Sequence, residues 1–518
     1  MAIIDFFDRG WRINARGIAY IQGERSYSFQ QAGELSCRIA NGLIAAGFAK
    51  QTKAAVWAGN DVTAWLCTLG VWRSGMTYIP VSGTNAPNDC QYVLDQFDCE
   101  ALFFTQAYAQ TIETLRPSLP KIRLWVCVDA DLSWAPSLAK WVDGQPSTKP
   151  LVDYGMDDVV SISATGGTTG VPKGVMNTHR SMQTYFAHYM MAFTYGASER
   201  PVNLAAAPMT HTAGSMSLPC TARGGTVVVI TKPDSELLLD AIATHRVTEF
   251  FLPPTVIYRL LDMPGIEARD FSSVKYLMYG AAPMSVDKLK RAIEVFGPVM
   301  AEGYGQTECP ASISNLMPAE HFVNGKIAPD KRLSSVGRPN PLIRVEIMND
   351  RNEILAPGES GEICVRGDLV MKGYYKAPDK TAEAIIDGWL HTGDVGHLDA
   401  EGYLHITDRK KDMIISGGFN VYPSEVEQVI WSHPAVQDCA VIGVPDEEWG
   451  EAVKAVVELN AGQSVSAEEL IALCKSKIGS VKSPKSVDFV IALPRSAIGK
   501  VLKKDLRAHY WQGQQRKI

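Results

Sequence analysis

The chain has 518 residues, a formal net charge of −6, 46% apolar residues and 20% charged residues. A chain of this length exceeds the size at which one hydrophobic core keeps growing, so we expect two or more domains. The mild negative charge argues against a nucleic-acid or anionic-membrane binder, and no apolar run approaches the roughly 20 residues that span a bilayer.

Ten cysteines are scattered along the chain, without a C-x-x-C pair or a Cys/His cluster. This usage predicts neither a zinc site nor a disulfide framework and favours a reducing compartment. The first residues, Met1–Asp5, lack the basic start and long apolar core of a signal peptide. We therefore expect a cytoplasmic protein.

The first clear element is a helix that Ser28 can cap and that Gly47 can stop, with apolar residues at helical spacing between them. Further along, short β-rich runs alternate with helical patterns. Strands are expected at 159–163, 202–207, 226–230, 249–252, 274–278 and 298–302. Helices are expected at 236–244, 255–262 and 286–296. This alternation predicts an α/β fold with mostly parallel sheets.

The pattern changes in the last third of the chain. Short strands separated by Gly and Pro predict a small β-rich subdomain at about 335–408. A charged break at 408–412 then precedes a second βα pattern, with helices expected at 425–431 and 467–477 and strands at 439–444 and 453–459. We expect an N-terminal domain over 1–408, a hinge at 409–411 and a small α+β C-terminal lid domain over 412–518.

A loop rich in glycine and threonine directly follows the expected strand at 159–163. It reads Thr165-Gly166-Gly167-Thr168-Thr169-Gly170-Val171-Pro172-Lys173-Gly174. Glycines let the backbone turn tightly and point successive N–H groups at an anion, and the threonine hydroxyls and Lys173 add donors. It is not the P-loop of kinases and GTPases, which ends Gly-Lys-Ser/Thr and opens a helix. The loop predicts a phosphate-binding site.

This loop resembles the signature of the adenylate-forming superfamily, which comprises acyl- and aryl-CoA synthetases, peptide-synthetase adenylation domains and luciferases. The superfamily usually has Ser where Gly166 stands. The resemblance runs from about Ser28 to Arg507 through five motifs in the expected order and is strongest to AMP-forming acyl-CoA synthetases.

The resemblance implies roles for further residues around the nucleotide. In Tyr304-Gly305-Gln306-Thr307-Glu308, Tyr304 would stack on adenine, Thr307 would contact phosphate and Glu308 would hold Mg²⁺. A flat aromatic ring suits a purine, and a hard oxygen ligand suits Mg²⁺ between phosphates. The segment at the adenine edge would be Gly280-Ala281-Ala282-Pro283. Asp394 would bind the ribose hydroxyls, and Arg409 would reach ribose and phosphate.

The remaining motifs concern catalysis and the thiol. By resemblance, Lys500 is the catalytic lysine that bridges the substrate carboxylate and the α-phosphate, and a cation there suits the charge that develops in the transition state. His211 would form a wall of the acyl site, although a lone histidine is more often structural. Lys411 would be the hinge, and Gly417 and Gly418 would admit the pantetheine arm of CoA, with a hairpin turn as the plainer interpretation.

The resemblance predicts an acid–thiol ligase that uses ATP, Mg²⁺ and coenzyme A to make an acyl-adenylate and then a thioester. Small residues predicted to line the acyl pocket indicate a roomy apolar site for a medium or long fatty acid, or for an aryl or alicyclic acid; they are Ala213, Gly214, Ser217, Cys309, Pro310 and Ala311. Two alternatives stay open: transfer to the phosphopantetheine of a carrier protein, and a nucleotide-binding regulator that never turns over. No nucleic-acid partner is expected, and a homodimer is left open.

Overall fold

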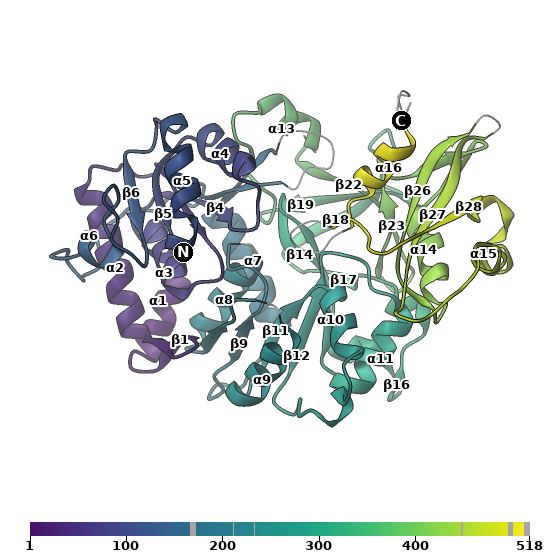
Figure 1. Cartoon of the computed structure of the whole chain (residues 1–518), viewed down its shortest axis with the longest axis horizontal. Helices are drawn as coiled ribbons and strands as arrows, with labels where there is room; N and C mark the ends of the chain where they lie inside the picture. Colours follow the sequence, from purple (N-terminus) through teal and green to yellow (C-terminus); the bar gives the residue numbers. More distant parts are fainter. Residues whose placement is uncertain (166–171, 211, 233, 447–448, 496–500, 512–518) are drawn as a thin grey trace.

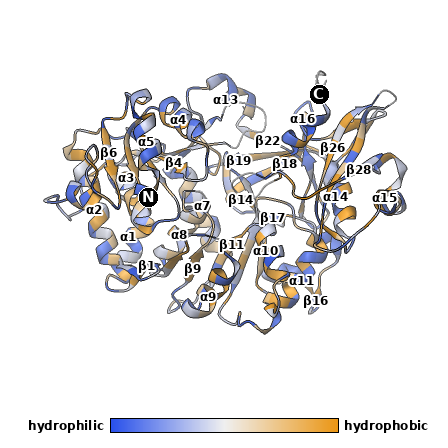
Figure 2. Ribbon diagram, viewed as in Figure 1, coloured by the Kyte–Doolittle hydropathy of each residue, from blue (hydrophilic) through white to orange (hydrophobic). Residues whose placement is uncertain are grey.

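The computed structural model describes residues 1–165, 172–210, 212–232, 234–446, 449–495 and 501–511. Its secondary structure forms two large mixed sheets, an antiparallel five-stranded sheet and a C-terminal α/β unit. Figure 1 shows the C-terminal elements, in yellow-green, at the end of the molecule opposite the purple N-terminal helices. In Figure 2 many strands are orange over part of their length, whereas helices α13 (Pro378–Ala384) and α16 (Lys503–Tyr510) are mostly blue or pale.

The predicted helix start at Ser28 is confirmed. The Ser28 hydroxyl accepts a hydrogen bond from the Gln31 N–H, and the Gln31 side chain accepts one from the Ser28 N–H. This reciprocal cap satisfies two N–H groups that the helix itself leaves without partners. Helix α2 then runs over Phe29–Ala45, and Gly47 follows with a φ of +78°, a left-handed value that favours glycine.

The seven-stranded sheet has the order β20-β8-β7-β4-β3-β5-β6, and the pairs from β7 to β6 are parallel. Strand β8 joins it antiparallel through the hairpin with β7. Its strands are β3 (Lys53–Ala58), β4 (Thr77–Ser82), β5 (Cys99–Phe104), β6 (Leu124–Cys127), β7 (Val159–Ala164), β8 (Gly174–Thr178) and β20 (Gly373–Tyr374). The α-helices in this part of the chain are α1 (Ile4–Ile13), α2, α3 (Val62–Arg73), α4 (Pro87–Gln96), α5 (Ala109–Leu115) and α6 (Leu138–Trp141).

The nine-stranded sheet has the order β17-β14-β13-β12-β11-β9-β10-β1-β2, and it is parallel from β13 to β1. Its strands are β1 (Ile18–Gln22), β2 (Arg25–Ser28), β9 (Val202–Ala205), β10 (Thr226–Val229), β11 (Glu249–Leu252), β12 (Tyr276–Gly280), β13 (Met300–Gln306), β14 (Cys309–Leu316) and β17 (Arg338–Pro339). The α-helices that connect these strands include α7 (His179–Ala192), α8 (Thr212–Ala222), α9 (Ser235–His245), α10 (Pro254–Leu261) and α11 (Val286–Phe296). The predicted α/β class with mostly parallel sheets is confirmed.

The predicted β-rich subdomain is also present. All pairs of the five-stranded sheet are antiparallel, in the order β18-β19-β22-β21 with β23 beside β22. Its strands are β18 (Ile343–Met348), β19 (Gly361–Gly367), β21 (Ile385–Ile386), β22 (Trp389–Leu398) and β23 (Leu404–Arg409). Small elements before it are β15 (Phe322–Val323), β16 (Lys326–Ile327) and α12 (Asp330–Leu333).

The C-terminal unit combines a sheet of order β25-β24-β27-β26, with β28 parallel to β27, and the helices α14, α15 and α16. Its elements are β24 (Ile414–Ser416), β25 (Phe419–Val421), α14 (Pro423–Trp431), β26 (Val436–Asp446), β27 (Gly450–Leu459), α15 (Ala467–Lys482) and β28 (Ser486–Val490). The Gln428 amide donates a 3.4 Å hydrogen bond to the Met284 carbonyl, and the Ser424 N–H donates a 2.9 Å bond to Asp408. These bonds join α14 to the preceding part of the chain.

Among the described residues, no helix is both long and apolar enough to cross a membrane. The division of the chain at 409–411 into two mobile domains stays a prediction.

Candidate active site

The base of the predicted phosphate loop is the end of the β7–β8 hairpin. The Thr165 N–H donates a 2.9 Å hydrogen bond to the Lys173 carbonyl, and the Lys173 N–H donates a 3.3 Å bond to the Thr165 hydroxyl. A Cβ at Gly174 would lie 2.7 Å from the Ile162 side chain, so this position requires glycine. The loop residues Gly166, Gly167, Thr168, Thr169 and Gly170 lie outside the described residues.

The predicted ribose site is a buried carboxylate with three partners. The Tyr304 hydroxyl and the Gln306 amide donate hydrogen bonds of 2.7 and 2.6 Å to one oxygen of Asp394. The Arg409 guanidinium lies 3.2 Å from the other oxygen, because Asp394 and Arg409 are directly opposite each other on β22 and β23. Tyr304, Asp394 and Arg409, which are far apart in sequence, therefore meet in one place.

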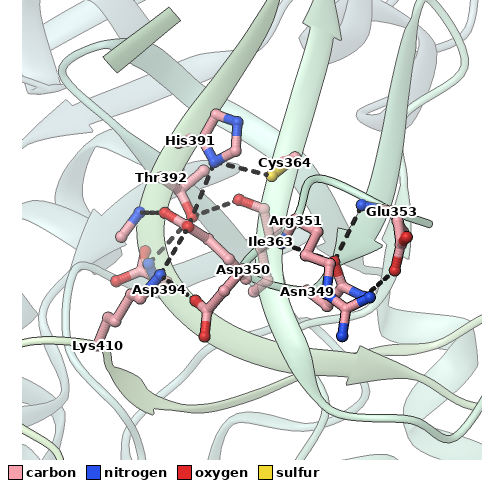
Figure 3. A network of polar contacts seen from close by, with 12 residues as sticks. Asn349, Asp350, Arg351, Glu353, Ile363, Cys364, His391, Thr392, Asp394 and Lys410 are labelled. Atoms are coloured by element: carbon pink, nitrogen blue, oxygen red, sulfur yellow. Dashed lines mark hydrogen bonds and ion pairs between the residues drawn. The ribbon is translucent and has the colours of Figure 1, made fainter. Parts of the chain in front are cut away.

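A second layer of contacts holds the turn that carries Asp394 (Figure 3). The Gly393 N–H donates a 3.0 Å hydrogen bond to Glu362, and the Thr392 hydroxyl donates a 2.7 Å bond to the Ile363 carbonyl. Lys410 lies 2.8 Å from Asp350 and 3.5 Å from Glu362. These bonds fix the backbone on either side of the Asp394 carboxylate, next to the predicted hinge.

Thr307 and Glu308 form the two-residue turn between β13 and β14, since Gln306 and Cys309 pair across the hairpin. The turn is anchored by the Asn177 amide, which donates a 3.3 Å hydrogen bond to the Thr307 carbonyl. Both residues, predicted to contact phosphate and metal, are therefore half-buried in the turn at the end of this hairpin.

Tyr374 connects this turn to the phosphate loop. Its hydroxyl donates a 2.8 Å hydrogen bond to Glu308, and the Lys173 ammonium lies 4.0 Å from the centre of its ring. Mg²⁺ in nucleotide sites keeps several waters and binds one or two carboxylates together with phosphate oxygens. A half-buried Glu308 within this arrangement fits such an ion, and the ion would neutralise charge on the polyphosphate.

The predicted adenine-edge segment follows β12 at the point where the chain comes closest to β13. A Cβ at Gly280 would lie 2.4 Å from the Gly303 carbonyl oxygen, and the φ of Gly280 is +158°. Ala281 takes a φ of +65°, which is uncommon for a residue with a side chain. Ala282 and Pro283 complete a tight, side-chain-poor turn that leaves room for a flat ring.

A small cavity of about 40 Å³ lies beside this turn. Helix α7 contributes Tyr185 and Tyr189, which share one helix face, and Phe193 directly follows the helix with the same four-residue spacing. Strands β11 and β12 contribute two further rings, and Met216 and Met278 also line the cavity. The five aromatic residues are Tyr185, Tyr189, Phe193, Phe251 and Tyr279.

Of the residues predicted for the acyl pocket, Ala311 lines this cavity, whereas Ala213, Gly214, Ser217, Cys309 and Pro310 do not. Gly214 faces Trp65, which a Cβ there would approach to 2.6 Å, and the Ser217 hydroxyl donates to the Gly214 carbonyl. Ala213 and Cys309 are buried. The cavity is small and lined mainly by aromatic rings, and the roomy acyl pocket expected from the sequence stays a prediction.

The predicted thiol tunnel residues form a β-turn. Gly417 and Gly418, with φ values of +57° and +80°, connect β24 to β25. The hairpin interpretation is therefore correct, and a role in CoA passage stays a prediction. Lys411 is partly buried, and burial lowers its pKa. Lys500 and His211 lie outside the described residues.

Several residues of the site were not anticipated. Gln306 lies inside a motif that was recognised, but the motif itself gives no reason to assign it a hydrogen bond to Asp394. Tyr374 and Glu362 contact the site from strands distant in sequence, which periodicity cannot reveal. The rings of α7 and of Phe193 directly after it had a signal in their spacing at 185, 189 and 193.

The fold and site define a nucleotide-dependent enzyme of the adenylate-forming class. The sequence model of the AMP-binding enzyme family matches residues 7–375, and that of the AMP-binding enzyme C-terminal domain matches residues 425–500. The chain therefore belongs to the AMP-binding enzyme family and is a ligase of the acyl-CoA synthetase type.

Named relatives and solved structures agree with this membership. The chain is 40% identical to a medium/long-chain-fatty-acid–CoA ligase, FadD8, of Mycobacterium tuberculosis over 72% of this chain and 65% of that protein, just under two thirds of its length. It is 34% identical to a feruloyl-CoA synthase of Amycolatopsis over 96% of this chain and 97% of that one. It superposes on the ATP-bound MatB structure from Rhodopseudomonas palustris with a TM-score of 0.89, at 28% identity, over 98% and 99% of the two chains.

Proposed function

We propose that this protein is an AMP-forming carboxylate–CoA ligase acting on a fatty, aryl or alicyclic acid. The proposal rests on the carboxylate of Asp394, which both Tyr304 and Arg409 contact. Lys173 and Glu308 form a second part of the site, where both contact Tyr374. Such a site suits a nucleotide, with a polar pocket for ribose and cationic and oxygen groups for its phosphates.

In the first step an oxygen of the substrate carboxylate attacks the α-phosphorus of ATP. The bond from that phosphorus to the bridging oxygen breaks, and pyrophosphate leaves. Lys173, Thr307 and the hydroxyls of Thr165, Thr168 and Thr169 would hold the phosphates. Lys500 would stabilise the charge that develops at the α-phosphate as two anions approach.

In the second step the sulfur of CoA attacks the acyl carbon, the bond to AMP breaks, and AMP leaves. Lys500 must withdraw for the thiol to approach. Rotation of the C-terminal unit about Lys411 would remove it and bring the Gly417–Gly418 turn toward the acyl carbon. Among the described residues, the Gln428 amide and both the N–H and the hydroxyl of Ser424 join α14 to the larger part of the chain by hydrogen bonds, which such a rotation would have to break.

An assay of thioester formation tests both this proposal and the alternative, a ligase that loads the phosphopantetheine of a carrier protein. The purified protein should consume CoA and release AMP in equal amounts with at least one acid of a panel running from acetate to palmitate and including benzoate, cinnamate and cyclohexanecarboxylate. Adenylation without CoA consumption, together with acylation of a phosphopantetheinylated carrier protein, would instead identify a carrier-protein ligase.

A further inference from the structure

The cavity beside the adenine-edge turn contains two buried phenols without partners. Tyr185 and Tyr189 are 2% and 4% exposed. Among the described residues, neither hydroxyl has a hydrogen-bond partner. Ser215 lies near Tyr185 and Glu249 lies near Tyr189, but neither is placed to form a hydrogen bond with the tyrosine hydroxyl. A buried hydroxyl that makes no hydrogen bond is costly, so these two groups need an explanation.

The other polar side chains that line the cavity are already bonded. The Tyr279 hydroxyl is 3.1 Å from a ring nitrogen of His321. The Ser312 hydroxyl is 3.1 Å from a ring nitrogen of His188. The Asn315 amide donates 3.1 Å to the Glu302 carbonyl and accepts from Asn340. Among the described lining residues, the two phenols are therefore the polar groups left for a ligand.

The position of the cavity connects it to the reaction. Tyr279 directly precedes Gly280 of the adenine-edge turn, and Gly303 directly precedes Tyr304 of the ribose site. An acid whose carboxylate reaches the α-phosphate from this side would extend its other end between the rings of α7, β11 and β12. Aromatic rings packed edge-on or offset favour another ring between them.

We propose that the acid activated by this enzyme is an aryl carboxylic acid that carries a hydroxyl on its ring, and that Tyr185 and Tyr189 bind this hydroxyl. The proposal rests on the ligase function above and narrows its substrate. An alkyl tail would leave both phenols buried and unbonded, whereas a ring hydroxyl can bond them. Water can fill the cavity when no acid is bound, since a water needs only roughly 10–15 Å³.

The test compares matched pairs of acids in the pyrophosphate-release assay. The pairs are benzoate with 4-hydroxybenzoate and cinnamate with 4-hydroxycinnamate, alongside octanoate and palmitate. In the unaltered enzyme the hydroxylated member of one pair should have the highest kcat/KM. It should exceed its unsubstituted partner by about tenfold, the scale of one lost hydrogen bond.

Two conservative variants test the hydroxyls of Tyr185 and Tyr189 separately. Tyr185→Phe and Tyr189→Phe keep the rings and should remove the preference for the hydroxylated acid, while kcat/KM for its unsubstituted partner changes less than about threefold. Tyr276→Phe is the control, since Tyr276 is on β12 but bonds Thr194 and does not line the cavity. The Tyr276→Phe variant should prefer the hydroxylated acid as strongly as the unaltered enzyme does.

Thermal shift gives a readout that does not depend on turnover. With ATP present, the hydroxylated acid should raise the Tm more than its unsubstituted partner, and the difference should vanish in both variants. A preference for octanoate or palmitate, or hydroxyl selectivity that survives in both variants, would overturn the inference while leaving the ligase function intact. Failure to release pyrophosphate with any acid would contradict the ligase function itself, and the substrate inference with it.

Discussion

The Tyr304 hydroxyl donates a 2.7 Å hydrogen bond to Asp394 and so joins β13 of the nine-stranded sheet to β22 of the antiparallel sheet. The carboxylate is only 4% exposed. It is therefore positioned by the contact of two sheets and not by either one alone. The proposed nucleotide site therefore lies where these two parts of the chain meet.

Tyr304→Phe should weaken this positioning while keeping the ring that is predicted to stack on adenine. Losing a hydrogen bond to a charged group corresponds to roughly a tenfold change in an equilibrium constant. We expect the KM for ATP to rise by about that factor and kcat to change little. Gln306→Leu should act in the same direction, since the Gln306 amide bonds the same oxygen. An unchanged KM for ATP in both variants would contradict the ribose assignment.

Tyr374→Phe should change the response to Mg²⁺. The variant loses the hydrogen bond to Glu308 but keeps the ring beneath Lys173. We expect the Mg²⁺ concentration for half-maximal activity to rise several-fold, and Mn²⁺ binding followed by electron paramagnetic resonance to weaken in parallel. Tyr375→Phe is the matched control, because Tyr375 bonds Asp98 on the far side of the sheet.

Lys500→Ala should lower the rate of adenylation by roughly 10²–10³, the scale of losing one transition-state donor. Thioester formation from pre-made acyl-adenylate should be much less affected. Lys504→Ala, on the exposed side of α16, is the control and should retain both half-reactions. Equal loss of both half-reactions in Lys500→Ala would contradict the assigned role.

Lys411→Pro tests the hinge. Proline fixes φ, so the substitution should block rotation of the C-terminal unit and impair thioester formation while sparing adenylation. Lys411→Ala removes the side chain but leaves the backbone free, and it should retain both steps. Pyrophosphate exchange compared with thioester yield distinguishes the two variants. Normal thioester yield in Lys411→Pro would exclude rotation at this residue.

The raised pKa of Glu302 predicts how the stability of the folded protein depends on pH. Burial raises the pKa of Glu302 to about 8, and a hydrogen bond with Tyr279 only partly offsets this. Between about pH 4.5 and 8 the folded protein therefore holds a proton that the unfolded chain releases, so this residue makes stability fall as pH rises. Glu302→Gln should flatten the fall in Tm across this range. Glu294→Gln, at an exposed position on α11, should not.

The sequence predicts helices and strands well where a single local pattern specifies the element. The expected helix at 286–296 matches α11, and the expected strand at 249–252 matches β11. The strand expected at 298–302 is β13, which starts at Met300 and continues to Gln306, because pairing with β14 carries it into the hairpin. Strand β14 was not anticipated, since its partner and not its own pattern specifies it.

The candidate site could be predicted only in part, because motifs identify some of its residues and tertiary contacts place the others. Tyr304, Asp394 and Arg409 were assigned from motifs, and the structure brings them together. Tyr374, Glu362 and the aromatic face of α7 depend on tertiary contacts between distant segments. The cavity proposed for the acid has walls from α7, β11 and β12 as well as from residues near the motifs.

Release of pyrophosphate from ATP by the purified protein, with Mg²⁺ and a broad panel of carboxylic acids but without CoA, tests the central claim most directly. We expect acid-dependent release that is strongest with a hydroxylated aryl acid and at least 100-fold lower in Lys500→Ala, the scale of losing a transition-state donor. No acid-dependent release with any member of the panel would contradict it.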